Sequence, residues 1–89
     1  MSEERTDKWV VYIVKCADTT FYTGITNGLD KRLKAHDAGT GAKYTRNRGP
    51  VVLVYAEAAI DRSAASKREY AIKKLSRAEK LVLISGAKI

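Results

Sequence analysis

Two short runs of strand-forming residues, joined by four turn residues, constrain the fold of this chain more than any other feature. Residues 9–16 and 21–25 are rich in β-branched and aromatic side chains, and the segment between them has the composition of a turn. A connection this short joins antiparallel neighbours. Because side chains alternate between the two faces of a strand, Tyr22 shares a face with Gly24. The pattern therefore predicts a β-hairpin that carries Tyr12 on one strand and Tyr22 on the other.

Three helices and one more strand follow the hairpin, in the order strand, strand, helix, strand, helix, helix. Asn27 is the predicted cap of the first helix, and either Asp61 or Ser63 is the predicted cap of the second. Ser76-Arg77-Ala78-Glu79 has the pattern of a capping box for the last helix. The third strand is predicted to carry on one face Val51, Leu53, Tyr55 and Glu57. The predicted segments are helices over 27–37, 61–75 and 76–84, a loop over 39–50 and a strand over 51–57. This order predicts one α+β domain over residues 1–89, with a core at about 8–84, in which helices flank a three-stranded sheet.

Charge is the strongest compositional feature. Seventeen Lys and Arg residues against ten Asp and Glu residues give a formal net charge of +7. Ten of the basic residues lie between positions 43 and 80, where only four acidic residues occur. A field of this sign attracts polyanions such as nucleic acids. The blander interpretation is that the charge serves solubility.

Several classes of protein are excluded or disfavoured. The longest apolar runs, such as residues 51–56, are about six residues, whereas a membrane span requires about 18–20. The polar N-terminus lacks the apolar core of a signal peptide, so we expect a cytoplasmic protein with no membrane partner. Cys16 is the only cysteine, so an internal disulfide and a cysteine zinc cluster are both excluded. Cys16 is interpreted as a strand residue rather than a nucleophile.

Polar side chains lie beside the apolar faces of two predicted helices. On the first helix, two leucines four residues apart form the core-facing stripe, and Arg32 and His36 flank it. On the second helix, Glu69 falls on the apolar stripe that Ala65 and Ile72 define. A guanidinium, an imidazole and a carboxylate are therefore expected to point inward, where the two tyrosines also lie.

Two phenols, a guanidinium, an imidazole and a carboxylate suit the cleavage of a phosphodiester. The reaction needs an activated water, neutralisation of charge on the phosphate oxygens and stabilisation of the leaving oxygen. Arg32 can bind two phosphate oxygens through its planar fork. Glu69 can hold Mg²⁺, which proteins often bind with one or two carboxylates. A tyrosine near Arg32 can accept a proton, directly or through His36, and the positive charge there is expected to lower the phenol pKa.

The ordered set resembles the GIY-YIG nuclease domain over about residues 8–84. The residues that carry the resemblance are Tyr12, Tyr22-Thr23-Gly24, Arg32, His36 and Glu69. It implies that Tyr12 and Tyr22 position or deprotonate the attacking water, and that Gly24 permits close packing. It further implies that Arg32 holds the scissile phosphate, that His36 assists proton transfer, and that Glu69 binds one divalent metal ion, Mg²⁺ or Mn²⁺.

The resemblance also implies a DNA-cleaving enzyme. Members of this family typically cut DNA in repair, restriction and intron homing, often with separate domains that choose the target. Residues 41–46 and 72–75 are similar to the small stand-alone YhbQ-like branch. We therefore expect an endonuclease for structured, nicked or single-stranded DNA, in preference to RNA, with a protein partner that supplies target specificity. The predicted nucleic-acid contacts are Gly24, Lys43, Tyr44, Arg46 and Arg48.

Each of these residues also has a purely structural interpretation. The tyrosines are ordinary strand formers, the first helix can turn its cations to solvent, and Glu69 can pair with Arg32 or Lys73. The first motif, Val10-Val11-Tyr12, keeps only the tyrosine of the family pattern, and no Asn follows Asn47. These departures motivate a second hypothesis, in which the domain binds nucleic acid or recruits a partner with little or no turnover.

Overall fold

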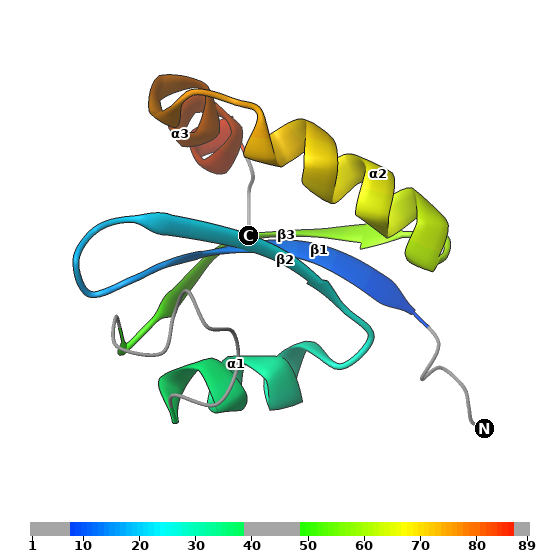
Figure 1. Cartoon of the computed structure of the whole chain (residues 1–89), viewed down its shortest axis with the longest axis horizontal. Helices are drawn as coiled ribbons and strands as arrows, with labels where there is room; N and C mark the ends of the chain where they lie inside the picture. The colour runs from blue at the N-terminus through cyan, green and yellow to red at the C-terminus, as the bar shows by residue number, and fades with distance from the viewer. Residues whose placement is uncertain (1–7, 39–48, 87–89) are drawn as a thin grey trace.

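The computed structural model describes residues 8–38 and 49–86 of the chain. Within these ranges, strands and helices follow one another in the order predicted from the sequence (Figure 1). They are β1 (Trp9–Lys15), β2 (Phe21–Thr26), α1 (Leu29–Asp37), β3 (Val52–Ala59), α2 (Arg62–Lys73) and α3 (Arg77–Gly86). The predicted α+β class and element order are confirmed, although β3 extends beyond the predicted end of its strand. Among the described helices, none is both long enough and apolar enough to span a membrane.

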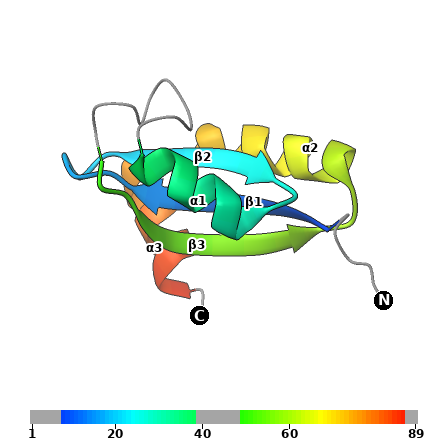
Figure 2. The same cartoon turned by 90° about the horizontal axis from the view of Figure 1, so that it is seen from below.

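The sheet has the order β2-β1-β3, and both pairings are antiparallel. β1 is the central strand, and its side chains from Val11 to Val14 are fully buried because both faces of the sheet are covered. In the hairpin, Tyr12 pairs with Gly24 and Val14 pairs with Tyr22, so both tyrosines point to the same face. Helix α1 lies on that face, and α2 and α3 lie on the other (Figure 1 and Figure 2). β2 is left as an edge strand between the two helical layers.

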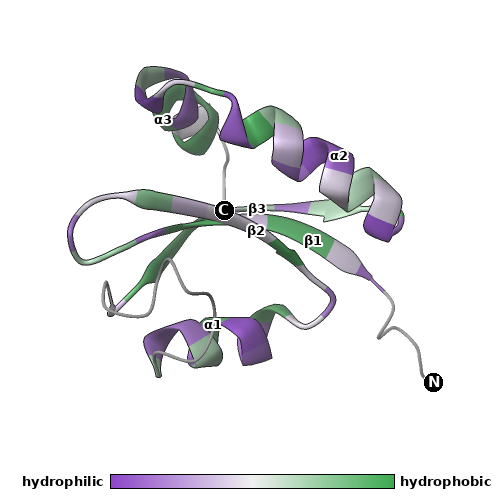
Figure 3. Cartoon of the chain, in the orientation of Figure 1, coloured by the Kyte–Doolittle hydropathy of each residue, from purple (hydrophilic) through white to green (hydrophobic). Residues whose placement is uncertain are grey.

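Two clusters of buried side chains form the core, one on each face of β1. Tyr12, Val14 and Cys16 pack with Val51 on the α1 side. The cluster on the α2 side contains Val11, Ile13, Tyr55, Ala65 and Ile72. Figure 3 shows apolar strands between helices that also carry hydrophilic residues. Alternation along the first strand divides the core in two, and it places Tyr12 beneath α1.

A register shift in the β1–β3 pairing corrects one prediction about the third strand. Ile13 pairs with Tyr55, but the next residue, Val14, pairs with Leu53, so one residue of β3 is left over between them. Leu53 therefore packs with the α1-side cluster and Tyr55 with the α2-side cluster. The prediction that Val51 and Leu53 share a face with Tyr55 is wrong, because a bulge reverses the alternation of faces.

The predicted capping box of the third helix is confirmed, and of the two candidate caps of the second helix the structure has Asp61. At the start of α2, Asp61 accepts a hydrogen bond from the Ala64 N–H at 2.8 Å. Before α3, the Glu79 N–H donates to Ser76 Oγ at 3.1 Å, and the Ser76 N–H donates to Glu79 Oε1 at 2.9 Å. This reciprocal pair is the capping box that the sequence predicts.

The start of α1 differs from the prediction. The N-cap residue is Gly28 rather than Asn27, and no side chain caps the first turn. The cause is local: the Gly28 N–H donates to Thr26 Oγ1 at 3.0 Å, which turns the chain so that the helix begins one residue later. The N–H groups of the first turn of α1 therefore have no side-chain partner at the cap, an arrangement that favours a nearby anion.

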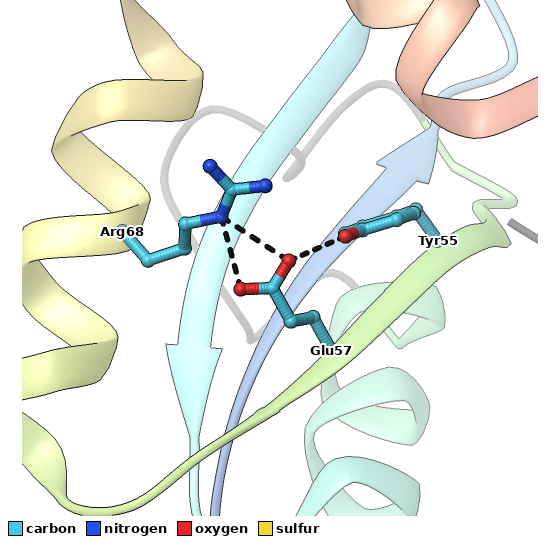
Figure 4. Close-up of polar contacts among 3 residues, drawn as sticks. All are labelled: Tyr55, Glu57 and Arg68. Carbon is cyan, nitrogen blue, oxygen red and sulfur yellow. Dashed lines mark hydrogen bonds and ion pairs between the residues drawn. The ribbon is translucent and has the colours of Figure 1, made fainter. Parts of the chain in front are cut away.

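A polar cluster fastens α2 to β3 on the face opposite α1 (Figure 4). The Nε–H of Arg68 donates to Glu57 Oε2 at 2.9 Å and to Oε1 at 3.1 Å. The Tyr55 hydroxyl donates to the same carboxylate. Burial and this contact raise the pKa of Tyr55. Glu69, the next residue, is rotated by about 100° around the helix from Arg68, and its charge acts on Tyr12 rather than on this cluster.

Candidate active site

The two tyrosines and His36 form one aromatic group between the sheet and α1. Tyr12 and His36 are fully buried, and Tyr12 Oη lies 2.8 Å from His36 Nε2, within hydrogen-bond distance. The ring centroids of Tyr12 and Tyr22 are 6.4 Å apart, and those of Tyr22 and His36 are 5.4 Å apart in an edge-on arrangement. The structure therefore brings together three of the predicted site residues from β1, β2 and α1.

Gly24 makes this arrangement sterically possible. A Cβ atom at position 24 would lie 2.6 Å from Tyr12 Oη, 2.8 Å from Tyr12 Cζ and 3.0 Å from Tyr22 Cε2. Any residue other than glycine would thus collide with the phenol that crosses β2. Gly24 is itself buried, so the close approach that it permits is that of Tyr12 and not that of a nucleic acid. Its function in the structure is to let Tyr12 reach His36.

Arg32 lies one helical turn before His36 and carries an unused donor. Its Nε is buried and has no hydrogen-bond partner in the part of the chain that the structure describes. The Tyr12 hydroxyl raises the pKa of Arg32, and Tyr22 acts in the same direction. Burial lowers this pKa, but by less than Tyr12 raises it. The guanidinium is therefore held beside both phenols while a donor is left for a ligand.

Arg32 also lines a pocket of about 280 Å³. Its lining residues are Thr26, Asn27, Gly28, Lys31, Arg32 and Ala35. It contains two cationic side chains and lies at the uncapped start of α1, so its chemistry suits an anion. Sequence reasoning did not assign Lys31 to the site; its position next to Arg32 was the available signal.

Glu69 approaches the site from the other helical layer. Its carboxylate forms an ion pair with Lys73, with 3.2 Å between Oε2 and Nζ. Lys73 Nζ in turn lies 5.9 Å from the centre of the Tyr22 ring. The charge of Glu69 is also among the influences that raise the pKa of Tyr12. The site therefore straddles the edge strand β2, with α1 on one side and α2 on the other.

The protonation states follow from burial. Burial raises the pKa of Tyr12, and the lowering effect of Arg32 does not reverse this. Burial and the charge of Arg32 lower the pKa of His36, with Asp37 opposing them. At neutral pH Tyr12 is therefore a protonated phenol and His36 a neutral imidazole. The expectation that positive charge would lower the pKa of this tyrosine is wrong for Tyr12, because burial outweighs the effect of Arg32.

Among the described residues, Glu69 is a carboxylate that a divalent cation at this site could use as a ligand. Within residues 8–38 and 49–86, no group of three or more His, Cys, Asp and Glu side chains is placed to hold a metal ion. Glu69 is about one quarter exposed and lies at the edge of the sheet. Mg²⁺ commonly keeps several waters and shares one or two carboxylates with substrate phosphates. Glu69 therefore fits a cation that the protein shares with its substrate.

The predicted loop contacts Lys43, Tyr44, Arg46 and Arg48 lie outside the described residues. Of the other predicted site residues, Tyr12, Tyr22, Arg32, His36 and Glu69 gather around one edge of the sheet. Lys73 was considered in the sequence only as a structural partner of Glu69. Its spacing of four residues from Glu69 on the same helix was the signal that placed it here.

Comparisons with known proteins identify the family to which this chain is similar. Residues 8–81 match the family model of the GIY-YIG catalytic domain. The chain is 60% identical over 79 residues to the UPF0213 protein CPE1444 of Clostridium perfringens. This match covers 89% of this chain and 85% of that protein.

Two solution NMR structures have the same fold. The UPF0213 protein BH0048 from Bacillus halodurans is 46% identical, with a TM-score of 0.57 over 88% of this chain and 83% of that chain. The protein EF2693 from E. faecalis is 38% identical, with a TM-score of 0.62 over 97% of this chain and 90% of that chain.

Proposed function

Because the chain belongs to the GIY-YIG catalytic domain family, we propose that it is a divalent-metal-dependent endonuclease for structured, nicked or single-stranded DNA. The observation that carries the proposal is Arg32, whose buried Nε has no partner among the described residues and whose guanidinium lies beside two phenols. A buried donor without a partner is costly unless a ligand satisfies it. A phosphate group, with its geometrically matched oxygens, is the ligand that suits a guanidinium.

The exposures of the two phenols divide their roles. Hydrolysis requires that a water oxygen attack phosphorus, that the bond to the leaving oxygen break, and that a base take the proton of the water. Tyr22 is only partly buried, so it is the phenol that this water can reach. Tyr12 and His36 are fully buried behind it, so the proton of the water would be passed on through the phenols and end on the imidazole of His36, which is the base. The neutral imidazole of His36 lies within hydrogen-bond distance of Tyr12 and is a suitable proton acceptor for it.

Glu69 would hold the divalent cation. When bound, the cation supplies charge stabilisation for the phosphate and the leaving oxygen. Arg32 would bind the scissile phosphate from the α1 side, and the pocket that includes Lys31 would receive a neighbouring phosphate of the same strand. The proposal has four further parts. The substrate is DNA in preference to RNA, the role is in repair, the location is cytoplasmic, and a protein partner selects the target.

A cleavage assay with the purified protein tests the assignment. Nicked, branched and single-stranded DNA, and RNA of the same sequence, are each incubated with Mg²⁺ or Mn²⁺. The protein added is the wild type, Glu69→Gln or Arg32→Ala. We expect each variant to lose on the order of 100-fold or more in rate, as is typical when one transition-state contact is removed. Glu79→Gln is the matched control, because it removes a carboxylate while glutamine preserves the capping box with Ser76.

The outcomes separate the nuclease from a binding module. If the wild type cleaves and Glu69→Gln cleaves equally well, the metal assignment is wrong. If the wild type binds nucleic acid but cleaves no substrate with either metal, the domain is a binding or recruiting module. Faster cleavage of RNA than of matched DNA would reverse the proposed substrate preference.

A further inference from the structure

Lys73 lies at the site on the side opposite Arg32. Its Nζ is 3.2 Å from Glu69 Oε2 and 5.9 Å from the centre of the Tyr22 ring. Arg32 lies beside Tyr12 and Tyr22 and comes from α1, whereas Lys73 lies over the Tyr22 ring and comes from α2. Two cations from two helices therefore flank the phenol that the proposed substrate can reach.

The ion pair and a metal ion compete for the same carboxylate. A hydrated divalent cation on the Glu69 oxygens would repel the Lys73 ammonium, so the ion pair weakens when the metal binds. The Lys73 side chain is half exposed, at 51%, and its four-carbon stem is flexible. Displacement by a metal ion would leave the ammonium free to turn toward another anion at the edge of β2.

We propose that Lys73 binds a phosphate oxygen of the nucleic acid once a divalent cation has taken Glu69, so that Arg32 and Lys73 hold the substrate from opposite helices. The inference rests on the proposed function for the identity of its ligand. No covalent bond is made or broken in this exchange: the cation replaces the ammonium at Glu69, and the phosphate replaces Glu69 as the partner of Lys73. In the absence of metal, Glu69 keeps Lys73 away from the substrate.

A purely structural role for Lys73 would be shared by its neighbour. Lys73 is in the last turn of α2, where a cation stabilises the helix end, and its pairing with Glu69 has the helical i,i+4 spacing. Lys74 is the C-cap of the same helix, and its Nζ lies 4.4 Å from the centre of the exposed Tyr70 ring. Lys74 therefore has the same charge at the same helix end but contacts a different aromatic ring.

The test compares Lys73→Met with Lys74→Met. Binding of a short single-stranded DNA is measured by fluorescence anisotropy in Ca²⁺ and in EDTA, and thermal unfolding confirms that both variants fold. In Ca²⁺, Lys73→Met should weaken binding by about 3- to 10-fold and lower the slope of log affinity against log salt by about one. In EDTA the effect of Lys73→Met should be smaller, because Glu69 already holds the ammonium. Lys74→Met should show no such dependence on metal.

A second background makes the exchange explicit. In Glu69→Gln the ammonium has lost its carboxylate, so Lys73→Met should cost as much in EDTA as it does in Ca²⁺ with the natural Glu69. Equal losses for Lys73→Met and Lys74→Met, or an effect of Lys73→Met that is the same with and without Ca²⁺, would overturn the inference. Because binding is measured apart from cleavage, a wild type that cleaves nothing would refute the nuclease alone.

Discussion

Replacing Gly24 with alanine should be one of the most destabilising single-methyl changes in this protein. The new Cβ would lie 2.6 Å from Tyr12 Oη and 2.8 Å from Tyr12 Cζ, well inside van der Waals contact. Tyr12 is fully buried, and its hydroxyl is hydrogen bonded to His36. The ring therefore has no empty space into which it can move without losing that bond or shifting the β1–β2 hairpin.

The expected cost follows from two contributions. Overpacking of a buried site costs about 1–3 kcal/mol, and loss of the Tyr12–His36 hydrogen bond costs about 0.5–1.5 kcal/mol. We expect Gly24→Ala to lower the free energy of unfolding by about 1.5–4.5 kcal/mol. For a domain of this size the melting temperature should fall by about 4–8 °C for each kcal/mol.

Urea unfolding followed by tryptophan fluorescence measures this loss. Gly28→Ala is the control, because a Cβ at position 28 meets nothing within 4 Å and should cost less than about 1 kcal/mol. Tyr12→Phe removes the atom nearest the new methyl group, so Gly24→Ala should cost at least about 0.5 kcal/mol less in that background. Equal stabilities of Gly24→Ala and Gly28→Ala would refute the reasoning that Tyr12 crosses β2 over a residue that must be glycine.

Three further predictions concern charge. Burial and the charge of Arg32 lower the pKa of His36 from 6.5. The neutral imidazole should therefore give its full contribution to stability above about pH 6.5, and stability should fall as the pH decreases through the lower pKa of the folded state. His36 is the only histidine, and urea unfolding of His36→Gln should lose this pH dependence between about pH 7 and 5; unchanged dependence would contradict the assignment. Glu57→Gln should lower the free energy of unfolding by about 1 kcal/mol, because solvent screens its partly exposed ion pair with Arg68, and should leave cleavage unchanged. Lost cleavage in a folded Glu57→Gln variant would contradict a purely structural role for the cluster of Tyr55, Glu57 and Arg68. Lys31→Ala should reduce the salt slope of DNA binding by about one, whereas Lys34→Ala, outside the pocket, should not; equal slopes would argue against a phosphate in this pocket.

The fold was largely predictable because its signals are local. The residues of β1 and the short turn after it require an antiparallel hairpin, and Asp61, Ser76 and Glu79 mark helix starts that the structure confirms. Two errors came from effects that sequence periods do not record. The bulge in β3 depends on packing against two different cores, and the Gly28 N-cap depends on a hydrogen bond to Thr26.

The identity of the site residues was predictable from the sequence, but their burial and protonation states were not. Positive charge near a tyrosine suggested a lowered pKa, yet Tyr12 is completely buried and its pKa is raised. Burial depends on which elements cover the side chain, and no spacing along one strand gives that information. The pairing of Glu69 with Lys73 was an open alternative in the sequence and is selected in the folded protein.

The sequence by itself determined which chemical groups are available and on which elements they lie. It placed the phenols on paired strands, Arg32 and His36 one turn apart, and Glu69 on a later helix, because strand and helix periods act over a few residues. Only the tertiary structure decided that these groups meet around the edge strand β2, with α1 on one face and α2 on the other. It also decided that Gly24 must be small and that Tyr12 is buried while Tyr22 remains accessible. These properties depend on contacts between residues far apart in the chain.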